Sequence, residues 1–343
     1  MQIMIILLLA IIIPVVGIIL GLFFKGIDRK GAAYYQGRIG PLLRQPYYDL
    51  KKLMVKQTIV PENAVPWIFK GAPLMAIASA AVLLVYIWVP YFLSLFKVEH
   101  SFVHGGDIIL IVYLLMLPAI FLIAGGFASG SPYATIGAQR EMVILMTTEL
   151  PLGVIVITFA SRMDTIAPHL PSFSITTIFH NPLWQTLGPL GIMGGILLVL
   201  TTIMIIPAEL AAIPFDQAEA ETEIAEGLIA EYSGKFLAFF QLADMLKVMA
   251  LTSLVIILFF PHGVEMLIGS KVMIGSFNIT IILDIILFLV KHLLVYFLTV
   301  TTVRIAMARL KISQVARLFI ITLTVISLTG FLLIYLDPII SKL

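Results

Sequence analysis

Eight apolar runs, each about 20 residues or longer, constrain the fold of this chain more than any other feature of its sequence. A helix needs about 20 apolar residues to cross about 30 Å of hydrocarbon. Composition agrees, because only 12% of the residues are charged, against about 25% in soluble domains. The sequence therefore predicts an all-α integral membrane protein, with one membrane domain over residues 1–343. The expected transmembrane helices cover residues 2–24, 67–96, 107–128, 141–160, 186–208, 236–261, 278–303 and 315–336.

The first run and the loop charges predict how the chain crosses the membrane. Residues 2–24 have no basic segment before them and no small-residue cleavage site, so they are interpreted as a retained span. Lys and Arg are concentrated in the odd-numbered loops, 14 against three. By the positive-inside rule, these loops face the cytoplasm and both termini lie outside. The 17 residues are Lys25, Arg29, Lys30, Arg38, Arg44, Lys51, Lys52, Lys56, Arg140, Lys235, Arg304, Arg309, Lys311 and Arg317 in odd loops, and Lys97, Arg162 and Lys271 in even loops.

The first cytoplasmic loop, about 25–66, contains an expected amphipathic helix within residues 37–57. Its apolar and basic side chains alternate at helical spacing, with Leu50, Leu53 and Met54 opposite Lys51, Lys52 and Lys56. Such a helix lies in the membrane interface as an anchor, or offers a docking surface to a soluble partner, and the two roles are compatible. The candidate docking residues are Arg38, Arg44, Tyr47, Tyr48, Asp49, Lys51 and Lys52.

The other two informative loops differ in character. Residues 125–142 are rich in small and turn-forming residues, which predicts a tight, packed connection. Residues 207–235 hold seven acids and one base; the acids are Glu209, Asp216, Glu219, Glu221, Glu223, Glu226 and Glu231.

The acidic loop predicts a partly buried cluster of carboxylates. In a continuous helix, four of these acids would share one face: Asp216, Glu219, Glu223 and Glu226. Apolar residues such as Phe215 and Leu228 are interleaved with them, so we expect the loop to fold against the membrane domain. Clustered, half-buried carboxylates have raised pKa values and share protons. The alternative is a solvated acidic loop.

Ionisable residues also stand inside the expected spans, where each costs about 2.5–3.5 kcal/mol on insertion scales and marks a functional candidate. Glu141 and Glu149 lie near one face of the fourth span, about 12 Å apart. In the sixth span, Asp244 and Lys247 are close enough to pair as a structural ion pair. The seventh span adds Asp284, Lys291 and His292, of which His292 has packing as its simpler interpretation. Together these residues suggest a proton or cation route from the cytoplasmic face.

Several kinds of chemistry are excluded by residues that the sequence lacks. The chain has no cysteine, so it holds no thiolate-ligated iron–sulfur cluster, disulfide or Cys-type zinc site. No nucleophile triad, His/Cys cluster, Walker loop or dinucleotide fingerprint accompanies the buried charges. We therefore expect no catalytic centre, cofactor or metal in this chain, and no nucleic-acid partner; any redox centres belong to partner subunits.

Four stretches resemble the H-type membrane subunit of respiratory complex I, in order along nearly the whole chain. They are GRIGPLLRQPYYDLKKL, GGFASGSPYATIGAQRE, the Glu149 region, and AELAAIPFDQAEAETEIAEGLIAEYSG. The last is the most specific, with Glu209, Pro214-Phe215-Asp216 and Glu231-Tyr232-Ser233-Gly234 at family positions. The family's Arg near the quinone chamber is replaced by Ala212.

QPYYDLKKL, SPYATIGAQREM and TTELPLG are more similar to the energy-converting nickel–iron hydrogenases and their sulfur-reducing relatives. That resemblance implies an anchor and ion-coupling subunit of a ferredoxin-linked complex that moves H⁺ or Na⁺. It implies three kinds of partner subunit: an iron–sulfur small subunit, a hydrogenase-like large subunit with or without a nickel–iron centre, and antiporter-like membrane subunits. Two alternatives stay open: a quinone-binding complex I-type subunit, and an independent secondary transporter, for which the inverted repeats of such proteins are not found.

Overall fold

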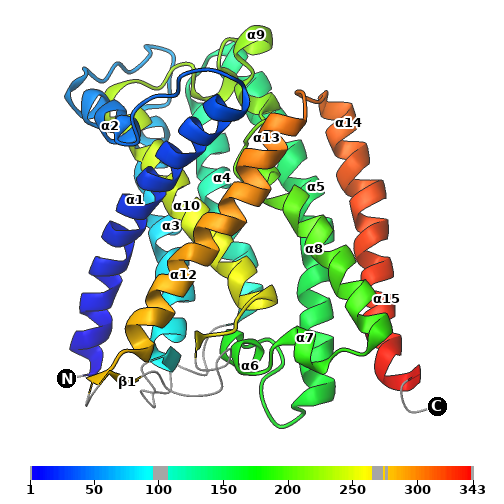
Figure 1. Cartoon of the computed structure of the whole chain (residues 1–343). Coiled ribbons are helices and arrows are strands. Elements are labelled where there is room, and N and C mark those ends of the chain that lie inside the picture. Colours follow the sequence, from blue (N-terminus) through cyan, green and yellow to red (C-terminus); the bar gives the residue numbers. More distant parts are fainter. Residues whose placement is uncertain (1, 96–106, 265–272, 275–276, 341–343) are drawn as a thin grey trace.

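The computed structural model describes residues 2–95, 107–264, 273–274 and 277–340 (Figure 1). Within these ranges, eight helical segments are long and apolar enough to cross a membrane, which confirms the all-α membrane fold. Of the even-loop basic residues, Lys97 and Lys271 fall outside the described residues. A two-stranded antiparallel hairpin, β1 (Met273–Ile274) with β2 (Phe277–Asn278), is a small addition to this fold.

Six of the spans are single helices: α1 (Gln2–Tyr35), α3 (Pro66–Leu95), α4 (Ile108–Ala128), α5 (Pro132–Ile166), α8 (Pro189–Glu209) and α10 (Gly234–Phe259). The last two contain π-helical turns: α12 (Thr280–Tyr296) continues through η4 (Phe297–Thr301) into α13 (Thr302–Ala306), and α14 (Ile312–Arg317) continues through η5 (Leu318–Leu323) into α15 (Thr324–Ile340). Proline begins α3, α5 and α8, where its missing N–H costs nothing.

Short helices lie at the two ends of the bundle. At one end are α2 (Gln45–Val55), η2 (Gln217–Glu219), α9 (Glu221–Ile224) and η3 (Gly227–Ile229). At the other are α6 (Ile175–His180) and α7 (Leu183–Thr186). Helix α1 begins, and α15 ends, at the α6–α7 end (Figure 1). Because the number of membrane crossings is even, the first and last spans have their outer ends on the same side of the bundle.

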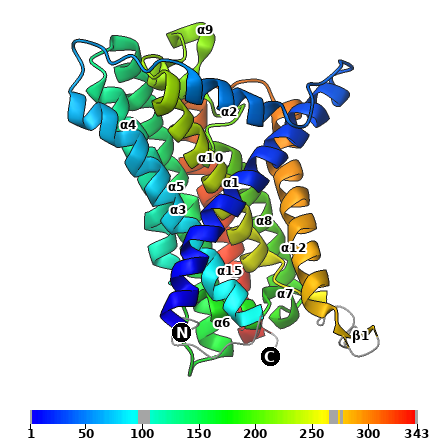
Figure 2. The same cartoon turned by 90° about the vertical axis from the view of Figure 1, so that its left-hand side faces the viewer.

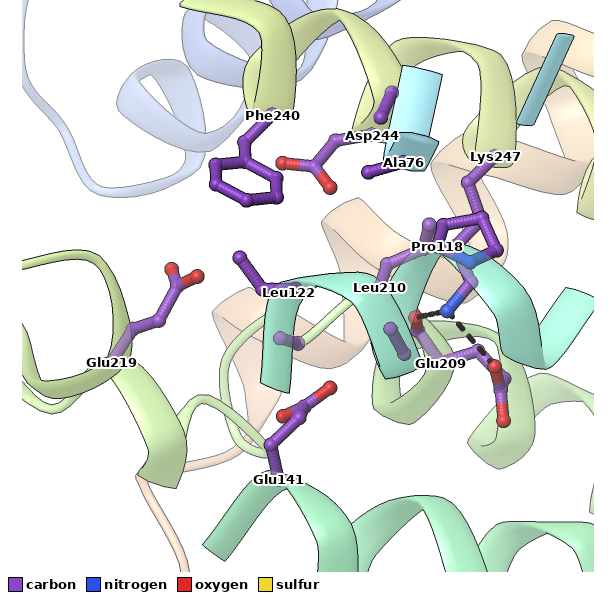
Figure 3. A pocket seen from close by; sticks show the side chains of 13 residues that line it. Ala76, Pro118, Leu122, Glu141, Glu209, Leu210, Glu219, Phe240, Asp244 and Lys247 are labelled. Carbon is purple, nitrogen blue, oxygen red and sulfur yellow. Dashed lines mark hydrogen bonds and ion pairs between the residues drawn. The ribbon is translucent and has the colours of Figure 1, made fainter. Parts of the chain in front are cut away.

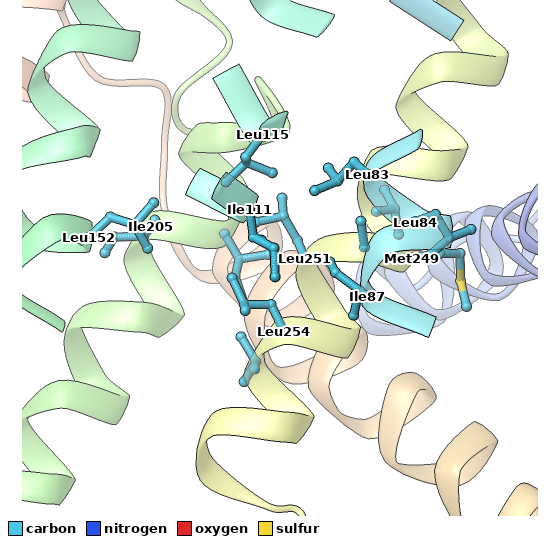
Figure 4. Packing of buried hydrophobic residues seen from close by; sticks show 14 of the residues in the cluster. Leu83, Leu84, Ile87, Ile111, Leu115, Leu152, Ile205, Met249, Leu251 and Leu254 are labelled. Carbon is cyan, nitrogen blue, oxygen red and sulfur yellow. The ribbon is translucent and has the colours of Figure 1, made fainter. Parts of the chain in front are cut away.

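The core is built around α10, in which 94% of an apolar stretch of 18 residues is buried. It packs against α1, α3 and α12, and α3 packs against α4, while α15 packs against both α5 and α8. Figure 4 shows buried side chains of α3, α4, α5, α8 and α10, with Leu251 of α10 close to Ile111 of α4. In a membrane such packing, and not hydrophobic exclusion, holds the helices together.

Two spans are longer than expected, because tertiary contacts extend them beyond their apolar runs. Helix α1 was expected to end at residue 24 but continues to Tyr35. Helix α5 was expected from residue 141 but begins at Pro132, so residues 129–131 alone connect it to α4. Its extra turns pack against the acidic loop at Gly137, where an added Cβ would lie 2.5 Å from the Leu228 nitrogen.

The acidic loop is not the continuous helix that would place four acids on one face, and that expectation is wrong. It breaks into η2, α9 and η3, because Ala225 (φ 47°) and Glu226 (φ 66°) are left-handed. This conformation is uncommon for residues with a Cβ and ends a right-handed helix. The loop therefore folds back over α5 and directs its acids in different directions.

The close approach of α8 and α15 gives a test of the packing. An added Cβ on Gly194 would lie 2.6 Å from the Gly330 carbonyl oxygen, whereas Gly71 of α3 has open space around it. We predict that Gly194→Ala lowers the stability by about 1–3 kcal/mol through overpacking. The measurement is the thermal unfolding midpoint in detergent. Gly71→Ala is the matched control and should not lower it; equal midpoints in both variants would contradict the packing.

Candidate functional site

A small cavity of about 50 Å³ lies inside the bundle, where four elements bring ionisable side chains together (Figure 3). Glu141 comes from α5, Glu209 from the end of α8, Glu219 from η2, and Asp244 and Lys247 from α10. In Figure 3, Glu141, Glu219 and Asp244 surround the same space. We call this set of five residues the acidic cavity. Its volume is sufficient for water molecules.

The most deeply buried contact in the acidic cavity is the ion pair of Lys247 with Glu209. The Lys247 Nζ lies 3.0 Å from Glu209 Oε2 and donates to the Glu209 main-chain carbonyl at 2.6 Å. The Thr148 hydroxyl donates to the other carboxylate oxygen at 2.8 Å. Among the described residues, the ion pair of Lys247 is therefore with Glu209, and not with Asp244 as the i+3 spacing suggested.

Two carboxylates of α5 flank this ion pair with unsatisfied oxygens. Glu141 is 6% exposed, and its Oε2 has no hydrogen-bond partner within the described part of the chain. The same holds for Oε1 of Glu149, two turns farther along α5. Buried polar atoms are nearly always paired with protein or water, so such exceptions require an explanation. Exchange of protons between these carboxylates and water would explain the unpaired oxygens.

Glu219 lines both the small cavity and a wider one of about 550 Å³, as Asp244 also does. Burial, with the negative charges of Asp244 and Glu141 nearby, raises the pKa of Glu219 to about 8. The Lys25 ammonium acts in the opposite direction but does not cancel this shift. Glu219 therefore changes its charge near neutral to slightly alkaline pH.

The wider cavity is lined by α1, α10, α12–α13 and the acidic loop, and three ion pairs surround it. Asp28 accepts from Arg304 at 2.7 Å and from the Thr301 hydroxyl at 2.7 Å. Asp216 pairs with Arg309, whose pKa this hydrogen-bonded carboxylate raises. The first contacts join η4 and α13 to α1, and the second joins the acidic loop to the segment between α13 and α14.

The third ion pair holds α2 in place. Arg29 lies 2.7 Å from Asp49; burial acts to raise the pKa of Asp49, but the hydrogen bonds from Arg29 and Gln45 hold it below its usual range. Helix α2 packs on α1 and α10 across the upper end of the bundle (Figure 2). Its apolar face is half-buried, while the other candidate docking residues project outward; these are Arg38, Arg44, Tyr47, Tyr48, Lys51 and Lys52.

The remaining acids of the loop lie nearer to solvent. Glu223 is exposed and pairs with Arg140 at 2.7 Å. Glu221 and Glu226 are exposed, and Glu231 is half-buried. Among these four, only Glu221 lines a described cavity, the wider one.

The charged residues of the seventh span are separated from the acidic cavity. Asp284 accepts a hydrogen bond from the Val264 amide, and Lys291 donates to the carbonyls of Phe260 and His262. These contacts satisfy the non-helical backbone that follows α10, as such a segment requires at membrane depth. His292 is fully buried and bonds to Ser253.

Sequence reasoning missed the structural roles of Lys25, Asp28, Arg304 and Arg309. The three basic residues counted only as orientation signals, because each follows or precedes an apolar run. The i+3 spacing of Lys25 and Asp28, directly after the first run, was the available signal that the helix continues. This spacing could not reveal that Asp28 pairs with Arg304 on α13, or that Arg309 pairs with Asp216 of the acidic loop.

Within the described residues, no group of three or more His, Cys, Asp or Glu side chains is positioned to hold a metal ion. The arrangement instead offers titratable carboxylates, a buried ammonium and space for water. Its possible chemistry is the movement of protons or small cations.

Comparisons with known proteins match the chain to one family over nearly its full length. The model of the family described as NADH dehydrogenase covers residues 6–335. Hydrogenase-4 component C of Escherichia coli (strain K12) is 30% identical over 270 residues, which are 79% of this chain and 80% of the relative. Formate hydrogenlyase subunit 4 of the same strain is 30% identical over 242 residues, 70% and 73% of the two chains.

A solved structure shows the same fold. A chain of the membrane-bound sulfane sulfur reductase, an archaeal respiratory membrane complex, superposes with a TM-score of 0.77. It is 26% identical, and the alignment covers 96% of this chain and 99% of that one. The resemblance to the complex I and hydrogenase superfamily is thereby confirmed.

The raised pKa of Glu219 predicts an unusual pH dependence of its reactivity. A folded-state pKa near 8 means that the folded protein binds a proton that an ordinary carboxyl, with a pKa of about 4.3, has lost. Folding stability from this group therefore falls as pH rises between these values. We predict that carbodiimide, which reacts with protonated carboxyls, labels Glu219 up to about pH 8 and less above it. Peptide mass spectrometry measures the labelling, and Glu219→Gln is the control; loss of labelling by about pH 5 would contradict the prediction.

Proposed function

Because the chain belongs to the NADH dehydrogenase family, we propose that it is the membrane anchor and ion-coupling subunit of a ferredoxin-linked, energy-converting respiratory complex. The complex is of the hydrogenase type or its sulfur-reducing relative, as the names of the similar proteins suggest. This subunit links electron transfer in peripheral partners to H⁺ or Na⁺ movement in the membrane. It supplies no redox centre itself, since it has no cysteine.

The acidic cavity is the observation that carries the proposal. It joins a wide, polar cavity to the interior of the bundle through Glu219 and Asp244, which line both. Glu141 lies on the inner side, with an unsatisfied oxygen. Buried titratable groups of this kind cost stability, so they are retained where they function. The series supports a route for protons between the loop end and the membrane interior.

The direction of this route follows from the loop charges. Helices α2, α9 and the α13–α14 connection share one end of the bundle, and they belong to odd-numbered loops (Figure 1). The excess of Lys and Arg in those loops assigns this end to the cytoplasm. Both termini are then extracytoplasmic, and the wide cavity lies on the side from which ferredoxin would deliver electrons to partner subunits.

The exposed surface of α2 is the proposed binding site for the peripheral partner subunits. Tyr47 and Tyr48 are 58% and 49% exposed, and Lys51 and Lys52 project from the same helix. Aromatic residues and arginine are enriched in binding surfaces, and Arg44 is exposed next to this helix. An iron–sulfur small subunit and a hydrogenase-like large subunit would bind here, while antiporter-like subunits would contact the spans.

A quinone-binding role is the second candidate, because the wider cavity is large enough for part of a quinone. Ala212 lines that cavity at the position where quinone-reducing relatives carry Arg. Nine of the 17 residues that line the cavity are charged, whereas a quinone tail requires a predominantly apolar lining. These features favour the hydrogenase-type role.

We predict that Glu149→Gln and Glu219→Gln each lower ion pumping by about tenfold, a barrier change of ~1.4 kcal/mol, while the complex stays assembled. A glutamine keeps the shape of the side chain but cannot carry a proton. The measurement is ferredoxin-driven ion uptake in proteoliposomes, relative to electron transfer. Glu223→Gln, at the exposed ion pair with Arg140, is the matched control. Normal pumping in both variants would make these acids structural.

We also predict that the double variant Lys51→Glu, Lys52→Glu weakens attachment of the peripheral subunits by about tenfold or more. Two charges at the proposed interface are reversed, a change of four units in net charge, and like charges there repel. Co-purification at physiological salt measures the attachment, and Lys311→Glu, an exposed residue on another loop, is the control. Full retention in the double variant would assign α2 to lipid.

A further inference from the structure

Lys247 occupies the position of a bound cation at the C-terminal end of α8. Its ammonium lies 3.0 Å from Glu209 Oε2 and 2.6 Å from the Glu209 carbonyl oxygen. That carbonyl belongs to the last residue of α8, where unpaired carbonyls and the helix dipole favour positive charge. A carboxylate oxygen beside a main-chain carbonyl is also the kind of ligand set that hard cations take.

The surroundings require a positive charge at this place. Glu141 and Asp244 interact electrostatically with Lys247, and Glu149 does so with Lys247 and Glu209. Lys247 and Glu209 are 5% exposed each. Removing Lys247 would leave the Glu209 carboxylate buried without a counter-charge, which favours binding of a proton or another cation there.

We propose that Lys247 is a specificity-determining residue, whose ammonium fills the site beside Glu209 where Na⁺ would bind and so restricts this route to protons. The inference rests on the proposed function of the acidic cavity. Protons pass between carboxylates and water by exchange, without a coordination site. Na⁺ needs oxygen ligands to replace its water, and the tethered ammonium holds those of Glu209. Lys247 cannot diffuse away as a free ion would.

Lys25 provides the contrast that makes the assignment specific. It also lies among these acids and interacts with Asp244, but from the wall of the wide cavity. Among the contacts of described residues, no hydrogen bond joins it to Glu209, whose carboxylate and carbonyl bond to Thr148 and Lys247. Loss of Lys25 removes a cation without freeing the Glu209 oxygens.

The test compares four forms of the purified, intact complex: wild type, Lys247→Met, Lys25→Met, and the double variant Glu209→Gln, Lys247→Met. The thermal midpoint of each is measured in NaCl and in choline chloride at equal ionic strength. In Lys247→Met we expect a saturable rise of about 2–4 °C caused by Na⁺. Lys25→Met and the double variant, which lacks the carboxylate, should show only the wild-type response to Na⁺. A Lys247→Met complex with that same wild-type response would overturn the proposal.

A second measurement decides the matter if Lys247→Met does not assemble. The double variant replaces both charges, a change that buried ion pairs often tolerate. Infrared difference spectra between Na⁺ and choline are recorded for it and for the wild type, and they should agree in the carboxylate region. A Na⁺-induced carboxylate band present only in the wild type would overturn the proposal. Neither experiment involves turnover, so a failure of proton pumping in cavity variants is a separate result.

Discussion

The buried ion pair of Lys247 with Glu209 is the interaction on which the interior of this protein depends. It joins α10 to the end of α8, and Thr148 adds α5 to the same contact. Breaking such a pair costs about 3–5 kcal/mol, because the remaining charge is left in a medium of low dielectric. The other buried acids are arranged around this fixed charge. Asp244 lies one turn from Lys247 on α10, and Glu141 of α5 points toward the same cavity (Figure 3).

The backbone after α8 determines which acids reach this centre. Left-handed residues at Ala225 and Glu226 turn the loop back over α5, and Gly137 allows its close approach. Glu219 is thereby directed into the protein, while Glu223 is directed to Arg140 at the surface. Ala211, with φ 45°, is a third residue of this kind in the segment. The strain of three such residues is consistent with a segment shaped for function. The acidic loop therefore lines the cavity through Glu219 and forms a surface ion pair through Glu223.

The sequence predicted what depends on local composition and missed what depends on partners. Apolar length is sufficient to locate all eight spans, because hydrocarbon thickness sets it. The ends of the spans were less predictable: the last turns of α1 contain charges that Arg304 and Asp49 neutralise from distant segments. Asp216 and Glu219 are buried or half-buried as expected, whereas Glu221, Glu223 and Glu226 are exposed. A helical pattern could not reveal the left-handed residues of this loop. The cross-helix partner of Lys247 left no signal at helical spacing.

The central claim is that carboxylates of the acidic cavity change protonation when the partner subunits receive electrons. Reduction-induced infrared difference spectra of the intact complex test it most directly, with Asp244→Asn to assign the bands. Asp244 lines both cavities, so its replacement should perturb any proton shared across them. We expect a carboxyl band that appears on reduction and is shifted or lost in Asp244→Asn. Reduction without any carboxyl change, in a complex that still pumps, would contradict it.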